Sequence, residues 1–333
     1  MSIPEPLGAA DAKEALEYFL AAGFDEIDTA ILYQDGKTEE TLGEIGMEKF
    51  RVAAKANPWY KEDASNDFFT PTYGLRPDLL KEQLRKSIQV LGVPSVDLFY
   101  LHAPDRNIPI EDTLRAVHEL RSEEGLFREW GVSNYTAWET VDIWHICKAN
   151  GWQTPAVYQG MYNALTREVE RELLPALKKL GMRFYAYNPL AGGLLSGKHK
   201  FEKPPEEGRF STNTLWGGFY RHRYWHKAIF DEIEKLKALC EKHDTKLVSA
   251  SFRWMRHHSN LSGRSSPENP VPRTSRRPPR APCAVLLRKA FCFLRIVATN
   301  GCTMPAPPPL VHHDIFALSQ KPLCRAVGRR NRR

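Results

Sequence analysis

One unit recurs through the first 263 residues of this 333-residue chain: an amphipathic helix ends on a glycine, and an apolar run begins a few residues later. The helix that Pro77 opens, for example, ends before Gly92, and the apolar run 96–102 follows it. Six such runs are expected to be strands, at residues 24–33, 51–57, 96–102, 127–134, 156–163 and 182–188. Helices are expected from a cap at Asp11 to Gly23 and over residues 77–91, 113–124, 137–150, 168–180 and 246–258.

Strands that alternate with helices at a spacing of roughly 30 residues indicate a parallel sheet with helical crossovers, which belongs to the α/β class. Such a sheet is either open and doubly wound or closed into an eight-stranded barrel. A polar residue lies at or near the C-terminal end of every expected strand, namely Asp28, Lys55, His102, Asn134, Gln159 and Asn188. Ligand residues of an open sheet concentrate at one switch point, whereas several strands of a barrel contribute to one face. The pattern therefore favours a (β/α)8 TIM barrel.

Four side chains near these strand ends suit proton transfer to a carbonyl oxygen: a carboxylate, a phenol, an amine and an imidazole, at Asp28, Tyr33, Lys55 and His102. A buried charge needs a partner, so Asp28 and Lys55 are expected to form an ion pair. A neighbouring ammonium favours the phenolate form of Tyr33. Each residue also has a purely structural interpretation: an ion pair within the core, a core histidine and a packed tyrosine.

The segments that carry these residues resemble the aldo-keto reductases. The resemblance rests on motifs that occur in the order EIDTAILY, AAKANPW, DLFYLHAPD, GVSNY, VYQGMYN and FYAYNPLAGGLLSGK. The last three motifs, with the aromatic stretch after them, are most similar to the aflatoxin B1 aldehyde reductase branch. The resemblance spans about residues 11–262. It implies a (β/α)8 barrel that reduces aldehydes to alcohols by hydride transfer from NADPH, without a metal.

The resemblance also implies a catalytic role for four residues. Tyr33 matches the proton donor, and Lys55 matches the residue that lowers the pKa of that donor. Asp28 matches the partner of Lys55, and His102 matches the group that orients the substrate carbonyl.

A second set of residues matches the cofactor site of the resembled family: Ser133, Asn134, Gln159, Tyr187, Asn188, Leu190, Gly192, Lys198 and Arg209. The first three would hold the nicotinamide carboxamide, and Tyr187 would stack on the nicotinamide ring. The loop 189–198 would bring backbone amides near the cofactor pyrophosphate, with Arg209 as a further phosphate contact.

The loop 189–198, PLAGGLLSGK, has a rival interpretation, because Gly192 to Lys198 fit the G-x-x-x-x-G-K pattern of nucleotide hydrolases. That pattern requires Ser or Thr next, to bind magnesium, and a helix whose N-terminus receives the phosphates. Here His199 follows, and two prolines soon after it interrupt any helix. The hydrolase interpretation is therefore disfavoured.

Residues 216–225, WGGFYRHRYW, combine aromatic and basic side chains. Such a mixture occurs in platforms for single-stranded nucleic acid, but this stretch is short and lies in an acidic part of the chain. In the resembled branch, Tyr220 and Arg223 match substrate contacts, alongside His102. An arginine there suits a carboxylate-bearing aldehyde such as succinic semialdehyde. The structural alternative is a surface loop packed by its own aromatic residues.

The composition changes near Gly263. Residues 264–333 contain 14 Lys and Arg against two acidic residues, so residues 1–263 carry a net charge of −5, although the whole chain carries +7. The tail also contains 11 of the 24 prolines. We expect a barrel over residues 1–263 and a basic tail over residues 264–333 that is disordered or aberrant in sequence. Strands one and eight of the barrel are not recognisable, so the barrel is expected to be incomplete.

The remaining expectations concern location and partners. The chain has no run of about 18 apolar residues and no signal-peptide order, so a cytoplasmic location without membrane contact is expected. The six cysteines lack metal-ligand spacing and are expected to be free thiols. A small aldehyde is the expected partner, no specific nucleic acid is expected, and a homodimer stays open. Two other functions also stay open: a non-catalytic barrel remnant that serves as a binding or subunit-interface module, and a nucleic-acid binder that acts through its tail.

Overall fold

The computed structural model describes residues 9–60, 73–257, 259 and 261. The described chain divides into two compact units. The first contains residues 9–161 and 168–187, and the second contains residues 162–167 and those from Asn188 onward. No helix within these described ranges is long and apolar enough to cross a membrane. The expected basic tail, with its four cysteines, lies outside the described residues.

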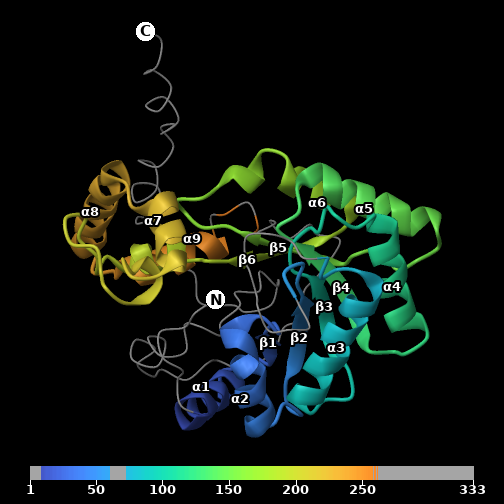
Figure 1. Cartoon of the computed structure of the whole chain (residues 1–333). Helices are drawn as coiled ribbons and strands as arrows, with labels where there is room; N and C mark the ends of the chain where they lie inside the picture. Colours follow the sequence, from blue (N-terminus) through green and yellow to red (C-terminus); the bar gives the residue numbers. More distant parts are fainter. Residues whose placement is uncertain (1–8, 61–72, 258, 260, 262–333) are drawn as a thin grey trace. The chain divides into compact units, whose positions relative to one another are not determined.

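The first unit is built on a parallel sheet whose six strands follow one another in sequence order (Figure 1). The strands are β1 (Glu26–Asp28), β2 (Arg51–Ala56), β3 (Val96–Leu101), β4 (Phe127–Ser133), β5 (Val157–Met161) and β6 (Arg183–Tyr187). Every neighbouring pair is parallel. The predicted α/β architecture is confirmed, and each observed strand lies within its predicted range.

The sheet is strongly curved, because side chains from strands far apart in the order meet on its inner face. Gln159 on β5 donates from Nε2 to Asp28 Oδ2, at the end of β1, over 2.7 Å. In a flat sheet, four strand spacings of about 4.8 Å would hold these two strands roughly 19 Å apart. The six strands therefore form the arc of an incomplete (β/α)8 barrel, as the sequence predicted.

Helices connect the strands, and α2 to α6 lie on the outer side of the sheet (Figure 1). In α3, buried residues recur at helical spacing, and Gly92 ends the helix in the left-handed region, with φ 66°. The helical elements of this unit are α1 (Ala9–Ala21), η1 (Tyr33–Gly36), α2 (Lys37–Ile45), α3 (Pro77–Leu91), α4 (Ile110–Ser122), α5 (Ala137–Ala149), η2 (Glu168–Glu170) and α6 (Leu173–Leu180).

Three local predictions were wrong. The run 24–33 is a strand only over β1, and Ile31 and Leu32 form a buried turn. Pairing between β1 and β2 ends at Thr29. The carbonyl of Thr29 accepts a hydrogen bond from Lys55 Nζ at 2.8 Å instead of from a backbone N–H of the neighbouring strand. Asp11 is not a cap, because α1 already begins at Ala9.

The third error concerns residues 168–180, where a single helix was expected. The structure has η2 and then α6, which begins only at Leu173. Pro175 explains the late start, since a proline lacks the backbone N–H and is tolerated only in the first turn of a helix. The helix α2, for which no prediction was made, follows Tyr33 almost directly.

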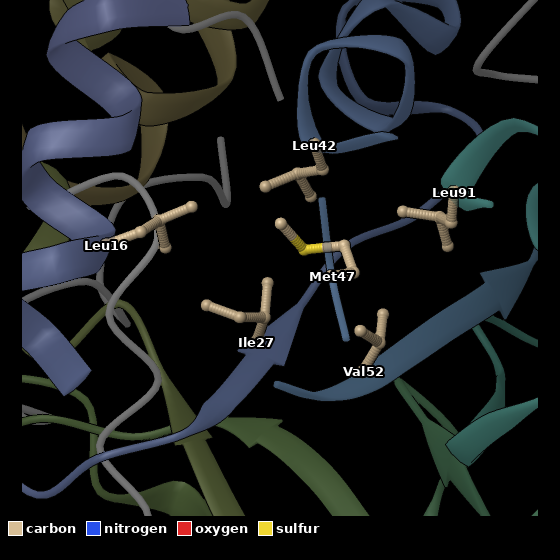
Figure 2. Packing of buried hydrophobic residues seen from close by; sticks show 6 residues of the cluster. All are labelled: Leu16, Ile27, Leu42, Met47, Val52 and Leu91. Carbon is tan, nitrogen blue, oxygen red and sulfur yellow. The ribbon is translucent and has the colours of Figure 1, made fainter. Parts of the chain in front are cut away.

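An apolar cluster anchors α2 to the sheet (Figure 2). Leu42 of α2 is fully buried and packs with residues from α1, β1, β2 and α3. The members of this cluster are Leu16, Ile27, Leu42, Met47, Val52 and Leu91, each at most 3% exposed. Burial of such side chains contributes roughly 1.5–3 kcal/mol each. The segment that carries Tyr33 is therefore held on both sides, by β1 before it and by α2 after it.

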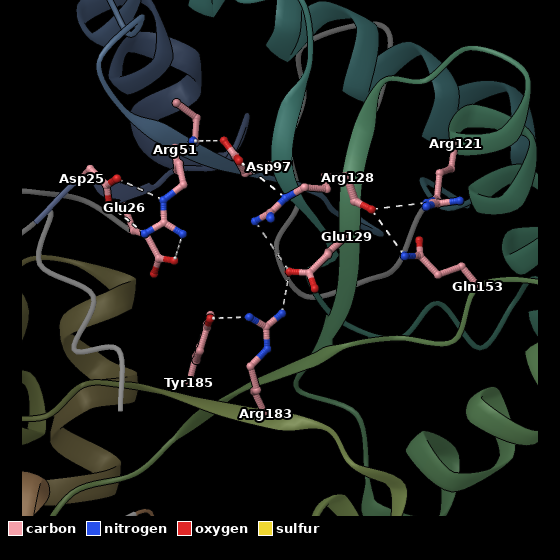
Figure 3. A network of polar contacts seen from close by, with 11 residues as sticks. Asp25, Glu26, Arg51, Asp97, Arg121, Arg128, Glu129, Gln153, Arg183 and Tyr185 are labelled. Atoms are coloured by element: carbon pink, nitrogen blue, oxygen red, sulfur yellow. Dashed lines mark hydrogen bonds and ion pairs between the residues drawn. The ribbon is translucent and has the colours of Figure 1, made fainter. Parts of the chain in front are cut away.

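A network of ion pairs lies near the N-terminal ends of the strands (Figure 3). Arg51, at the start of β2, pairs with Asp25 at 2.7 Å and with Glu26 at 2.8 Å. Arg183, at the start of β6, pairs with Glu129 of β4 at 2.6 Å. Asp97, Arg128 and Tyr185 extend the network. These charges lie at the opposite end of the strands from the predicted catalytic residues.

The second unit contains η3 (Ala191–Ser196), η4 (Gly208–Phe210), α7 (Leu215–Tyr224), α8 (Lys227–Lys242) and α9 (Leu247–His257). The stretch 216–225 lies almost entirely in α7, so the surface-loop alternative was wrong. Thr214 caps this helix by accepting a hydrogen bond from the Gly217 amide at 3.0 Å. The buried Phe210 ring packs on Tyr220 and Tyr224, with centroids 5.8 and 6.5 Å away.

Candidate active site

The four predicted catalytic residues come together at the C-terminal ends of β1, β2 and β3. Lys55 is 1% exposed, and its Nζ forms an ion pair with Asp28 Oδ1. The same Nζ donates to the Thr29 carbonyl at 2.8 Å and to the Tyr33 hydroxyl at 3.2 Å. The ammonium is thus held by two acceptors, the Asp28 carboxylate and the Thr29 carbonyl. Its third hydrogen bond goes to the Tyr33 hydroxyl.

The charge state of Lys55 follows from these contacts. Burial acts to lower the pKa of the Lys55 ammonium, but Asp28 and then Tyr33 raise it by more, so the pKa lies above its ordinary value. The ammonium therefore stays protonated at neutral pH. It also lies 4.8 Å from the centroid of the Tyr33 ring, within the range of a cation–π contact.

His102 follows β3 and lies beside the phenol. Its ring meets the Tyr33 ring edge to face, with the centroids 5.7 Å apart. Burial, and then the charge of Lys55, hold the pKa of His102 well below its ordinary value. The imidazole is therefore uncharged at neutral pH, and its Nδ1 has no hydrogen-bond partner among the described residues.

Three of the predicted nicotinamide residues are linked by hydrogen bonds at the same end of the sheet. Asn134, with φ 64°, donates from Nδ2 to the Ser133 hydroxyl at 3.1 Å and to the His102 carbonyl at 2.9 Å. The Tyr187 hydroxyl donates to Asn134 Oδ1 at 2.7 Å. The fourth residue, Gln159, is joined to Asp28 instead.

This set of groups fits a nicotinamide. Ser133 and Gln159 are buried, and they present a hydroxyl and an amide, which are the partners that a carboxamide needs. Tyr187 is half-buried, and its bond to Asn134 fixes the ring at the end of β6. These side chains therefore supply donors and acceptors of the kind that a carboxamide requires.

In the second unit, the structure brings several predicted loop residues together. Asn188 Nδ2 donates to the Tyr220 hydroxyl at 3.2 Å, and Arg209 reaches Asn188 Oδ1 at 3.5 Å. A Cβ on Gly192, whose φ is 70°, would lie 2.7 Å from the Tyr220 ring. Tyr220 therefore packs directly on the glycine loop, which only a residue without a side chain permits at this position.

The glycine loop bonds partly to itself. The Leu190 carbonyl accepts hydrogen bonds from the amides of Gly193 at 2.9 Å and Leu195 at 3.2 Å. Between Lys198 and Glu207 the structure has no helix, so the hydrolase interpretation lacks the element that it requires. Lys198 is exposed, and no contact within the described residues joins it to Asn188 or Gly192.

The arginines of α7 differ from one another. Arg223, the predicted substrate contact, is exposed. Arg221, which the sequence reasoning did not select, donates to the carbonyls of Phe210, at 3.1 Å, and Ser211. It therefore ties α7 to η4, and its role is structural.

Sequence reasoning also missed two residues behind the catalytic group. The Thr29 carbonyl is a direct partner of Lys55, but a backbone acceptor leaves no signal in a sequence. Glu39 is a buried carboxyl on α2. Glu39 lies three residues before the buried Leu42 and therefore on the same face of the helix. This spacing was the signal in the sequence that Glu39 is buried.

Neither metal ligation nor disulfide bonding was found in the described part of the chain. No group of three or more His, Cys, Asp or Glu side chains there could hold a metal ion. Cys147 and Cys240 are buried free thiols, and burial raises the pKa of Cys147 to about 12, which makes that thiol unreactive.

Comparison with known proteins gives a consistent result. Residues 2–277 match the model of the aldo/keto reductase family. The chain is 46% identical over 277 residues to aflatoxin B1 aldehyde reductase member 2 of Mus musculus, which covers 79% of this chain and 72% of the relative. It is 48% identical over 259 residues to aflatoxin B1 aldehyde reductase member 4 of Homo sapiens, which covers 74% of each chain.

Among solved structures, the glycerol dehydrogenase of Gluconobacter oxydans matches with a TM-score of 0.60 and 26% identity. The match covers 75% of this chain and 74% of that protein.

Proposed function

This chain belongs to the aldo/keto reductase family, whose members are oxidoreductases that use nicotinamide cofactors, and we propose that it reduces aldehydes to alcohols with NADPH and with Tyr33 as the proton donor. The observation that carries the proposal is the contact of 3.2 Å between the Lys55 ammonium and the Tyr33 hydroxyl. A phenol beside a fixed positive charge gives up its proton more easily than a free phenol.

In the proposed mechanism, Asp28 and the Thr29 carbonyl hold the Lys55 ammonium in place. Tyr33 donates its proton to the substrate oxygen, and the ammonium stabilises the phenolate that remains. His102 is uncharged, so it can orient the carbonyl oxygen by a hydrogen bond without competing as a proton donor. NADPH, when bound, supplies the hydride that reaches the carbonyl carbon.

The residues proposed as cofactor contacts fall into two groups. Ser133, Asn134 and Gln159 would bind the carboxamide, and Tyr187 would stack on the ring. For the phosphates we propose Lys198 and Arg209, because both carry a positive charge and the loop before them is rich in glycine. Asn188, Leu190 and Gly192 would shape that loop.

For the substrate, we propose an aldehyde, since two relatives bear the name of an aldehyde reductase. Arg223 is an exposed guanidinium in the helix that also carries Tyr220, and it suits a carboxylate on the substrate through paired hydrogen bonds. The cytoplasmic location stays a prediction from the sequence, and the question of a homodimer stays open.

The test is NADPH binding by the purified chain, followed by fluorescence quenching, and aldehyde turnover by the wild type and by Tyr33→Phe. We expect Tyr33→Phe to bind NADPH normally and to lose turnover by at least about a hundredfold, because general-acid catalysis typically contributes 10²–10⁴. The matched control is Tyr73→Phe, which removes an exposed hydroxyl outside the site. Normal turnover by Tyr33→Phe would refute its role as the donor. A folded chain that fails to bind NADPH would instead support the non-catalytic barrel remnant.

A further inference from the structure

Glu39 is a buried acid that the proposed mechanism does not use. It lies in the first turn of α2, six residues after Tyr33, and its side chain is 1% exposed. It forms no ion pair with the described residues, and its Oε1 has no hydrogen-bond partner among them. A carboxyl so placed is costly to ionise, because it is shielded from water and no cation forms a direct ion pair with it among the described residues.

The surroundings of Glu39 connect it to the catalytic group. Two residues of α3, Ser87 and Lys86, act on its carboxyl. Lys55 of β2 and Thr29, which follows β1, act on it as well. No charged group of α1 or η1, which also pack against α2, is among those that act on it. Thr29 acts on Glu39 through its side chain. The backbone carbonyl of the same residue accepts the hydrogen bond from Lys55 Nζ at 2.8 Å. Glu39 and the Lys55–Tyr33 pair therefore share Thr29 as a neighbour.

The protonation of Glu39 changes near neutral pH. Burial raises the pKa of its carboxyl to about 7, although Ser87, then Lys55 and then Thr29 act in the opposite direction. Below this pH the carboxyl is neutral, and the Lys55 ammonium acts on Tyr33 with its full charge. Above this pH a second carboxylate, besides Asp28, offsets the ammonium, so the Tyr33 proton is held more tightly.

We propose that Glu39 is a positioning residue that sets, through its own protonation, how strongly Lys55 acidifies Tyr33, so that the reduction carries a pH step belonging to Glu39. This inference extends the proposed reductase function. Its activity measurement rests on that function. Glu39 itself touches neither substrate nor cofactor in this scheme.

The experiment compares the wild type with Glu39→Gln, which keeps the shape of the side chain but cannot ionise. We expect the kcat/KM of the wild type to fall about three- to tenfold as the pH rises through about 7, because the newly ionised Glu39 carboxylate partly offsets the charge of Lys55. Glu39→Gln should keep the higher value through this range. Glu40→Gln, which removes an exposed carboxylate one position along the helix, should behave as the wild type.

A second readout does not require turnover. The ionisation of Tyr33 can be followed by ultraviolet difference absorbance, with Tyr33→Phe subtracted from each protein. We expect Tyr33 to ionise at lower pH in Glu39→Gln than in the wild type and unchanged in Glu40→Gln. An unchanged Tyr33 titration in Glu39→Gln would overturn the inference. A shifted titration in a chain without turnover would leave the inference standing and refute the reductase function.

Ser87→Ala gives an independent check, should Glu39→Gln fail to fold. Ser87 favours the ionised form of Glu39, so its removal should move the pH step upward rather than abolish it. A step, or a Tyr33 titration, that does not move in Ser87→Ala would show that Glu39 is not its source.

Discussion

Gly131 occupies a position in the sheet that leaves no room for a side chain. It lies in β4 opposite Val157 of β5, and a Cβ at this position would lie 2.3 Å from the Val157 carbonyl and 2.9 Å from the Tyr100 ring. Tyr100 is fully buried, and the centroid of its ring lies 5.8 Å from Lys55 Nζ. The Tyr100 ring therefore fills the space that a side chain at position 131 would need.

We therefore predict that Gly131→Ala destabilises the chain by about 1–3 kcal/mol, the usual cost of overpacking a core. Urea unfolding monitored by circular dichroism would measure the change. Gly218→Ala is the matched control, since a Cβ inside α7 at that position meets nothing within 4 Å. There the substitution should be neutral or stabilising by up to about 1 kcal/mol. Equal effects of the two substitutions would contradict this explanation.

Glu39 gives a second prediction at this scale, which concerns stability. The pKa of its carboxyl is raised from the ordinary 4.5 to about 7 in the folded chain, mainly by burial. The folded state therefore holds a proton that the unfolded state has lost between these values, and the free energy of unfolding falls as the pH rises through them. Glu39→Gln should be more stable than the wild type by up to about 3 kcal/mol above pH ~7.

Below pH ~4.5 the two proteins should have similar stability, because both carry a neutral side chain in both states. Thermal or urea unfolding at several pH values measures this difference. If the difference in free energy of unfolding between the two proteins does not change with pH, Glu39 is not buried in its neutral form.

At this scale, sequence reasoning predicted the polar groups at strand ends but not all of their partners. The pairing of Lys55 with Asp28 follows from the cost of a buried charge, and the structure has that ion pair. The bond from Gln159 to Asp28 joins residues 131 positions apart. It depends on the curvature of the whole sheet, which no local pattern records. Whether the residues act as proposed stays a prediction.

At the scale of elements, the predicted strands and the observed ones agree best where both faces of the strand are buried. β3, for example, matches the apolar run 96–102 almost completely. β1 is shorter than its apolar run, because Ile31 and Leu32 are buried in a turn rather than in a strand. Burial alone cannot distinguish the two, since a short apolar run fits either.

The same argument explains why α2 was not predicted. Its first turn carries Thr38 and Glu39 on the buried side, so polar residues occupy part of the face that an amphipathic pattern requires to be apolar. Leu42 is the residue that fastens this helix to α1, α3 and the sheet (Figure 2).

We predict that Leu42→Ala destabilises the chain by about 2–5 kcal/mol, since it leaves a cavity in a cluster that brings five elements together. Because α2 follows Tyr33, the same substitution should also lower turnover, even though Leu42 touches none of the catalytic residues. Glu40→Ala, on the exposed side of α2, is the control and should cost less than about 0.5 kcal/mol. A Leu42→Ala protein as stable as this control would show that the cluster does not anchor the helix.

At the scale of the whole molecule, the sequence predicted an incomplete barrel, and the six-stranded arc agrees with it. Among the described residues, β1 and β6 each have a single strand neighbour, so each leaves one edge of backbone groups without a strand partner there. Closure of a barrel depends on pairing between the first and last strands, which is the contact with the largest separation in sequence.

We propose that the boundary near Gly263 separates a barrel from a tail of a different physical character. The tail carries a surplus of twelve positive charges over acidic residues, whereas residues 1–263 carry a net charge of −5. Binding to a polyanion through such a tail releases counterions, so it depends steeply on salt and little on nucleic-acid sequence.

The chain should therefore bind single-stranded oligonucleotides of unrelated sequence with similar affinity, and the affinity should fall at least about tenfold between 50 and 200 mM salt. Fluorescence anisotropy with labelled oligonucleotides measures both properties. The matched variant keeps the full length and replaces the 14 basic residues of 264–333 with glutamine, which should abolish the binding and leave NADPH binding unchanged. Binding that survives this replacement would locate the basic surface within residues 1–263, where the net negative charge argues against it, and a marked preference for one sequence would revive the nucleic-acid alternative.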